Sequence, residues 1–151
     1  MHDVAWGLGG KRTELWKKAK NRDDALLRCC ENDITIFSLG KVGENYIPYP
    51  IEEVKKEFSP YRLNVDYFSC GVCYAIALAI YQRATRIDLW GMFIAATEEY
   101  AYQKPGIEFW IGVAIGRGID VRIHGKSHLL VNREGYLYGY NTKQERQCLP
   151  L

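Results

Sequence analysis

Hydrophobic residues recur at helical spacing in two long stretches of the chain. The first runs from Val72 to Tyr81, and its apolar side chains fall three or four positions apart, at Val72, Ala75, Ile76, Ala79 and Ile80. This spacing places them on one face of a helix, and the small alanines permit close approach to a sheet. The second stretch, "IEFWIGVAIGRGI", repeats the pattern. Both stretches therefore predict buried helices.

Short apolar runs separate these helices. "DITIFSL", "RIDLWG" and "DVRIH" predict strands, and "LNVDYF" alternates weakly, as a further short strand would. The resulting order is strand, helix, strand, helix, strand. That alternation predicts an α/β fold with a largely parallel sheet and right-handed crossovers. Because the chain has the length of one domain and no clear internal boundary, residues 1–151 are expected to form a single domain.

Two more helices are predicted nearer the N-terminus. Residues 11–30, "KRTELWKKAKNRDDALLRCC", are rich in helix formers. The segment "PIEEVKKEF" starts on Pro50, carries glutamates in its first turn and has lysines near its end, which suits both proline placement and the helix dipole. The stretch "GKVGENYIPYP" is expected to be a loop because of its Gly, Asn and Pro content.

The charge balance argues against a general affinity for nucleic acid or anionic membranes. The 20 basic and 18 acidic side chains leave a formal net charge of +2, so any anion site must be local. The longest apolar stretch is far shorter than the roughly 20 residues that a membrane-spanning helix needs. The N-terminus also lacks a charged-then-apolar signal pattern. A soluble, cytoplasmic protein is therefore predicted.

Three predicted loops lie where open α/β sheets bind ligands, outside the carboxyl ends of strands. They are residues 68–71, 91–105 and 124–128. In the first, Ser69 and Gly71 precede a buried helix, whose free backbone N–H groups and positive dipole end favour a phosphate or carboxylate. The alternative is that Ser69 is only an N-cap and that Gly71 permits tight packing.

Cys70 and Cys73 lie in that turn with the spacing of a redox motif. A thioredoxin-like site has a different setting, and zinc would need a second Cys or His pair at ligand spacing. Five cysteines is an odd number and Cys29 adjoins Cys30, so a disulfide framework is a poor explanation. The pattern therefore favours reduced, buried thiols over a redox couple or a metal site.

The second and third loops contain the other candidate residues. Tyr100 and Tyr102 can hydrogen-bond a phosphate or stack on a base, and Glu99 can act as a general base. The alternative is a solvated loop with its tyrosines packed on their own helix. His124 is four residues from His128, but Gly125 argues against the helix that a metal pair would need there. His124 can instead act as a proton shuttle or phosphate donor.

A long joint pattern carries a resemblance to a known family. "YFSCGVCYAIALAIYQRATRIDLWGMF", "EYAYQKPGIEFWIGVAIGRGIDVRIHGKSHLL" and "LYGY" together resemble the C-terminal two-thirds of a phage and prophage family of Rossmann-like proteins, sometimes labelled norphogenetic proteins. The resemblance covers residues 34–140. It implies a three-layer Rossmann-like domain with a mostly parallel sheet, in a phage-associated protein of the host cytosol.

More remotely, the layout is similar to bacterial sialyltransferases and to hydroxymethylpterin diphosphokinase-like proteins. This similarity implies that a nucleotide or nucleotide-sugar binds at Ser69, Cys70 and Gly71 and beside Gly91, with nucleotide-phosphate tyrosines near positions 100 and 102. Glu99 and His124 are the remaining candidates for catalysis. The resemblance identifies neither a metal ligand nor a cofactor.

Two departures from the family pattern bear on activity. Phe93 stands where the family has an aspartate, and the Gly-x-Gly-Pro-Ser phosphate loop is missing. "GLGG" at residues 7–10 is not expected to replace that loop, because no strand is predicted before it. The chain is expected to lack its first strands and to self-associate through unpaired sheet edges. Two hypotheses remain: a nucleotide-binding, degenerate or truncated transferase, and a non-catalytic assembly module.

Overall fold

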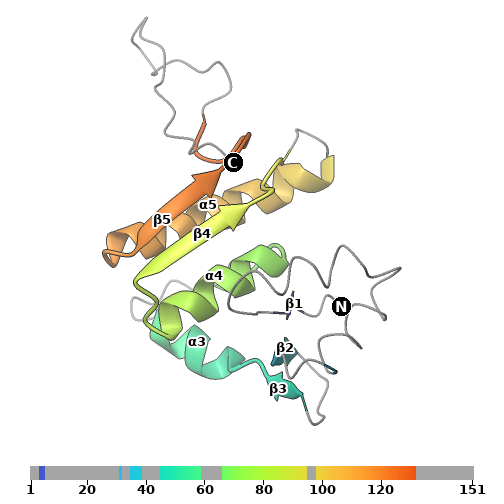
Figure 1. Cartoon of the computed structure of the whole chain (residues 1–151), viewed down its shortest axis with the longest axis vertical. Helices are drawn as coiled ribbons and strands as arrows, with labels where there is room; N and C mark the ends of the chain where they lie inside the picture. The colour runs from blue at the N-terminus through green and yellow to red at the C-terminus, as the bar shows by residue number, and fades with distance from the viewer. Residues whose placement is uncertain are drawn as a thin grey trace, which may run out of the picture. The chain divides into compact units, whose positions relative to one another are not determined.

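The structure is a computed structural model that describes residues 4–5, 31, 35–38, 45–58, 66–94 and 98–131. The chain divides into two compact units, Met1–Leu63 and Asn64–Leu151, and each is described by itself. Helices and parallel strand pairs are present in both, so the predicted α/β class is confirmed (Figure 1). The described strands form two sheets rather than the single sheet that was expected.

The first unit contains a three-stranded sheet in the order β1, β2, β3. Its strands are β1 (Val4–Ala5), β2 (Ile36–Ser38) and β3 (Tyr46–Pro48), and β2 pairs antiparallel with β1 and parallel with β3. The prediction of a strand in "DITIFSL" is confirmed. Strand β1 lies before Gly7, so the expectation of no strand ahead of the "GLGG" segment was wrong.

Strand β3 also corrects the prediction of a loop in "GKVGENYIPYP". The Ile36 amide donates to the carbonyl of Asn45 at 2.8 Å, and the Tyr49 amide donates to the carbonyl of Ser38 at 2.9 Å. Pro48 belongs to β3, an edge strand of the described sheet, and an edge strand tolerates the missing N–H of proline. Pairing with β2 therefore outweighs the weak strand propensity of this stretch.

Helix α3 (Ile51–Phe58) follows β3 and confirms the helix predicted in "PIEEVKKEF". Glu52 and Glu53 lie in its first turn and the two lysines in its last turn, as the helix dipole favours. Val54 is fully buried and anchors the apolar side of the helix. The helix predicted over residues 11–30 lies outside the described residues.

The second unit alternates two helices with two parallel strands. Helix α4 (Gly71–Tyr81) leads into β4 (Arg86–Trp90), and α5 (Glu98–Gly116) leads into β5 (Asp120–His124). All four confirm predicted elements. Each helix reverses into its strand through a short turn, so both helices begin at the end of the sheet where both strands finish (Figure 1). Helix α5 packs against both α4 and β5.

Helix α5 begins before Pro105, so the expectation of a loop over residues 91–105 was wrong for its second half. Proline removes one backbone hydrogen bond from a helix interior. The burial of Ile107, Trp110, Ile111 and Ala114 on the same helix, each at most 1% exposed, offsets that loss. The described part of "LNVDYF", residues 66–68, forms no strand.

Trp110 is the largest fully buried side chain in the described core. Its indole Nε1 donates to the carbonyl of Tyr67 at 2.9 Å. The ring stacks on Phe68 with centroids 5.0 Å apart, and Phe68 stacks in turn on Tyr74 of α4 at 4.4 Å. These contacts join the segment before α4 to the middle of α5. None of the described helices is both long and apolar enough to span a membrane.

Candidate functional site

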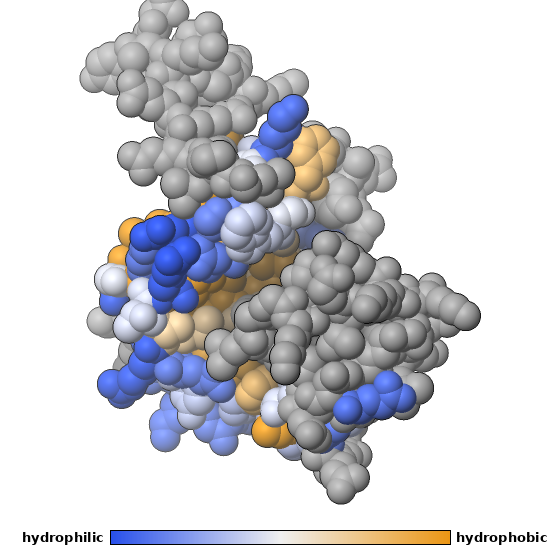
Figure 2. Space-filling model, viewed as in Figure 1, coloured by the Kyte–Doolittle hydropathy of each residue, from blue (hydrophilic) through white to orange (hydrophobic). Residues whose placement is uncertain are grey.

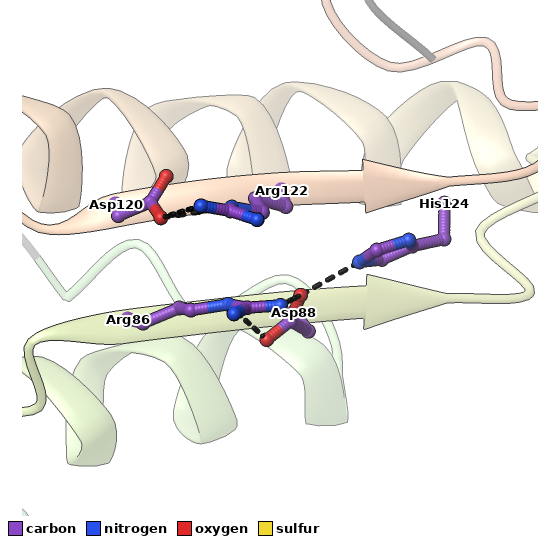
Figure 3. A network of polar contacts seen from close by, with 5 residues as sticks. All are labelled: Arg86, Asp88, Asp120, Arg122 and His124. Atoms are coloured by element: carbon purple, nitrogen blue, oxygen red, sulfur yellow. Dashed lines mark hydrogen bonds and ion pairs between the residues drawn. The ribbon is translucent and has the colours of Figure 1, made fainter. Parts of the chain in front are cut away.

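One side of the β4–β5 sheet carries six alternating residues, which we call the polar face: Arg86, Asp88 and Trp90 from β4, and Asp120, Arg122 and His124 from β5. Between them, Ile87 and Leu89 are buried, because successive side chains of a strand point to opposite sides. Figure 3 shows the helices behind the two strands, and Figure 2 shows a largely hydrophilic surface over them. The polar face therefore lies opposite the apolar side that packs on the helices.

Asp88 is the centre of this polar face. Its carboxylate accepts two hydrogen bonds from Arg86, from Nη2 to Oδ1 and from Nε to Oδ2, each at 2.7 Å. The Nε2 atom of His124 lies 2.6 Å from the same Oδ1 (Figure 3). The hydrogen bonds from Arg86, and then the one from His124, hold the pKa of Asp88 below its usual value. Asp88 is therefore an anion across neutral pH.

His124 is held between this carboxylate and an aromatic ring. Its ring stacks on the indole of Trp90 with centroids 3.9 Å apart and planes within 1° of parallel. His124 is only 7% exposed, whereas Trp90 is 53% exposed. The Nδ1 atom of His124 is buried and has no hydrogen-bond partner among the described residues. A buried polar atom without a partner is unusual and requires an explanation.

The position of Asp88 assigns the proton on His124. An ionised carboxylate can only accept, so Nε2 must carry the hydrogen that it shares with Asp88. In the neutral ring, Nδ1 is then a lone-pair acceptor. A carboxylate that fixes the tautomer of an imidazole is the arrangement that general-base histidines use. Nδ1 is therefore an acceptor that is covered in this structure, and an external donor could reach it only after the covering side chains move.

This pair predicts a pH effect on stability. Because the folded-state pKa of Asp88 is depressed, its contribution to the free energy of unfolding is present above the unfolded pKa of about 3.9 and is lost as pH falls through the folded pKa. We expect Asp88→Asn to lower stability near neutral pH and to change it little at the acid end. Urea-induced unfolding between about pH 2 and pH 7 covers this loss and measures it. A constant difference between the two proteins over that range would contradict the prediction.

The two strands end on glycines that turn the chain away from the sheet. Gly91 (φ 69°) follows Trp90, and Gly125 (φ 73°) follows His124, and this left-handed region favours glycine. The Oγ atom of Ser127 donates to the carbonyl of Met92 at 2.9 Å. This bond ties together the two segments that leave the sheet.

Exposed aromatic and basic residues surround this end of the sheet. The rings of Phe93 and His128 meet edge to face with centroids 4.9 Å apart. Phe93 is 58% exposed, and Lys126 and His128 are also exposed. We call the group formed by Trp90, Gly91, Phe93, His124, Lys126 and His128 the carboxyl edge.

The turn before α4 packs against α5. The Oγ atom of Ser69 donates to the carbonyl of Gln103 at 3.2 Å, so this hydroxyl does not cap α4. Cys70 is the N-cap residue of α4, and its side chain makes no capping hydrogen bond. Gly106 lies directly against Ser69, because a Cβ there would overlap Ser69 Oγ. Ser69 is therefore a packing residue as well as a candidate for ligand binding.

The structure brings some of the predicted site residues together. Gly91 and His124 both lie at the carboxyl edge, while Ser69, Cys70 and Gly71 form the start of α4. Tyr102 is on α5 and is 79% exposed. Two more candidates, Glu99 and Tyr100, belong to the first turn of α5, and their side chains lie outside the described residues.

Sequence reasoning missed Asp88, Arg86 and Trp90. The signal was available as two matching alternations, Arg-x-Asp-x-Trp and Asp-x-Arg-x-His. Only the in-register pairing of β4 with β5 brings Asp88 and His124 within hydrogen-bonding distance. Among the described residues, no group of three His, Cys, Asp or Glu side chains is placed to hold a metal ion.

Comparison with protein-family models, with curated proteins and with solved structures finds no match for this chain. The geometry described above therefore carries the functional argument.

Proposed function

We propose that the chain is a Rossmann-like, phage-associated protein that binds a nucleotide or nucleotide-sugar at the carboxyl edge. The observation that carries this proposal is His124, held by Asp88 and Trp90 at the end of a parallel strand with its buried Nδ1 unpaired among the described residues. Open α/β sheets bind ligands outside the carboxyl ends of their strands. A ligand that uncovers Nδ1 and donates to it would satisfy this atom.

The chemistry of the carboxyl edge suits a planar base joined to a negative group. Trp90 and Phe93 are more than half exposed, and an aromatic ring can stack on a base of any sequence. Lys126 and His128 supply basic groups on the same segment, which can pair with phosphate oxygens. The first turn of α4 at Gly71 is a second place where a phosphate could bind, because free backbone N–H groups at the start of a helix donate hydrogen bonds to it.

Any transfer chemistry in this chain would rest on its own acid–base groups. His124, which Asp88 orients, would act as the base if ligand binding uncovered Nδ1, and Glu99 is the second candidate from the sequence. The resemblance to nucleotide-using transferases supports this assignment, and the lack of the family's aspartate at Phe93 favours a degenerate enzyme. A cytoplasmic location agrees with this proposal.

Titration calorimetry of the full chain against nucleotides, nucleotide-sugars and pterins tests the proposal. A ligand at 100 times its dissociation constant should also add about 2.7 kcal/mol to stability in a thermal-shift assay. We expect Trp90→Ala to weaken binding about 5- to 150-fold, because one base stacked on an aromatic ring contributes about 1 to 3 kcal/mol. Ile115→Ala is the matched control, since Ile115 is a 53% exposed apolar residue at the opposite end of α5.

Two further variants locate the phosphate. If it rests on the start of α4, Gly71→Val should abolish binding at modest cost in stability, whereas a phosphate held by Lys126 should be lost in Lys126→Met instead. Equal affinity of Trp90→Ala and the parent protein for the ligand would exclude the carboxyl edge as the binding site. Failure of every ligand class would favour the competing hypothesis of a self-associating assembly module.

A further inference from the structure

The first turn of α4 brings two thiols into contact. Cys70 Sγ and Cys73 Sγ lie 3.6 Å apart, and Ser69 Oγ lies 3.5 Å from Cys73 Sγ. Both cysteines are free. A disulfide requires sulfurs about 2.05 Å apart, and rotation about the side-chain bonds of two residues in the same turn can close the remaining distance. The sequence pattern favoured two inert thiols, but this geometry favours a reactive pair.

The surroundings of the two sulfurs stabilise one thiolate. The hydrogen bond from the Cys70 thiol is the main influence that lowers the pKa of Cys73, burial opposes it, and the net result is a pKa of about 6. The same hydrogen bond between the cysteines raises the pKa of Cys70. The pair therefore shares a single proton near neutral pH. The positive end of the helix dipole also stabilises a thiolate at the start of a helix.

The two thiols differ in their access to solvent. Cys73 is fully buried, whereas Cys70 is partly exposed. Helix α5 packs against Cys73 on its buried side. A Cβ atom placed on Gly106 of this helix would lie 3.2 Å from Cys73 Sγ. Of the two thiols, Cys70 is thus the one open to an external molecule, and Cys70 in turn contacts Cys73.

We propose that Cys70 and Cys73 form a thiol–disulfide exchange site that takes a low-molecular-weight disulfide, RSSR, as its co-substrate. Cys70 attacks one sulfur of RSSR as its proton passes to the Cys73 thiolate, and the first RS⁻ leaves. Cys73 gives that proton to the departing RS⁻ and then attacks Cys70 in the mixed disulfide. The second RS⁻ leaves, the protein pair is oxidised by two electrons, and RSSR is reduced to one thiol, RSH, and one thiolate, RS⁻, which takes up a proton from the solvent.

A redox titration of the full chain tests this site without any substitution. The reduced protein is equilibrated in glutathione buffers of increasing oxidised fraction, quenched with N-ethylmaleimide and digested with trypsin. The masses of the peptides are then measured by mass spectrometry. Both cysteines fall in one tryptic peptide, residues 63–83, while Cys29 and Cys30 fall in another, residues 29–41. In the more oxidised buffers we expect the 63–83 peptide to carry no N-ethylmaleimide and to weigh two hydrogen atoms less than the unlabelled reduced peptide, as a disulfide requires. In excess reduced glutathione the peptide should again carry two N-ethylmaleimide groups. Full labelling at every buffer ratio would overturn the proposal.

Two serine variants test the order of attack. Cys73→Ser should accumulate glutathione on Cys70, because the thiol that resolves the mixed disulfide is gone. Cys70→Ser should take up glutathione at least 10-fold more slowly, because Cys73 is buried. Equal rates in the two variants would contradict the assigned roles. Circular dichroism establishes that each variant folds. The redox titration of the unsubstituted protein does not depend on the two variants, and its result does not depend on whether the protein binds a nucleotide.

Discussion

Replacing Trp110 by alanine should lower the free energy of unfolding by about 3 to 5 kcal/mol, the usual cost of removing a buried tryptophan. The indole is fully buried on α5 and stacks on Phe68. Its removal leaves a cavity at the point where the segment before α4 meets α5. It also leaves the carbonyl of Tyr67 without the hydrogen bond from Nε1, which adds a desolvation cost. Since whole domains are stable by only about 5 to 15 kcal/mol, this loss would remove a large share of the free energy of unfolding.

Two further substitutions separate the causes of this loss. Trp110→Phe keeps an aromatic ring in the core but removes the donor to Tyr67, so it should cost less than Trp110→Ala. Tyr102→Ala on the same helix should change stability by less than about 0.5 kcal/mol, because Tyr102 is 79% exposed. Urea-induced unfolding followed by far-ultraviolet circular dichroism measures all three. Equal losses for Trp110→Ala and Tyr102→Ala would mean that Trp110 does not anchor this core.

Two glycines of α5 should respond to alanine in opposite directions. A Cβ at Gly106 would overlap Ser69 Oγ and lie 3.0 Å from Ser69 Cβ, whereas a Cβ at Gly112 would meet nothing within 4 Å. We expect Gly106→Ala to destabilise the protein by about 1 to 3 kcal/mol, the typical cost of overpacking. Gly112→Ala should stabilise it by about 0.4 to 1 kcal/mol, because alanine restricts the unfolded chain and favours a helix.

A double-mutant cycle tests whether Ser69 is the cause of the first effect. Ser69→Gly removes the two Ser69 atoms that the new methyl group would meet and leaves the contact with Cys73 Sγ at 3.2 Å. The double variant should therefore be more stable than the sum of the single changes by about 1 kcal/mol or more. The same measurement on Ser69→Gly with Gly112→Ala should give simple additivity. Additivity in the Gly106 cycle would show that the methyl group is accommodated elsewhere, and that α4 and α5 are not packed as closely as Ser69 and Gly106 indicate.

Local side-chain patterns were enough to predict most elements of the second unit. The helical spacing of Val72 to Tyr81 predicted α4, and the short apolar run "RIDLWG" predicted β4, whose residues the structure shows to be exposed and buried in turn. The same held for α3, with acidic residues in its first turn and basic residues in its last. These predictions succeed because the spacing of apolar residues can be counted along the chain. An element with one buried face repeats its apolar residues about every 3.6 positions in a helix and every 2 positions in a strand.

Other features depended on residues far apart in the chain. Strand β3 forms in a stretch of weak propensity because β2 supplies its hydrogen bonds, and α5 continues through Pro105 because its apolar face is buried. The sequence by itself identified His124 as chemically interesting, but not Asp88, which contacts it only through the parallel register of β4 and β5.

The cysteines show the same division between sequence and tertiary structure. Their spacing placed Cys70 and Cys73 in one turn, and the apolar run after them predicted the helix that this turn begins. Only the packing of α5 behind that turn decided that one thiol is buried beside Ser69 while the other stays open to solvent. Reactivity follows from burial, hydrogen bonds and access, and these are set by tertiary neighbours that no local pattern encodes.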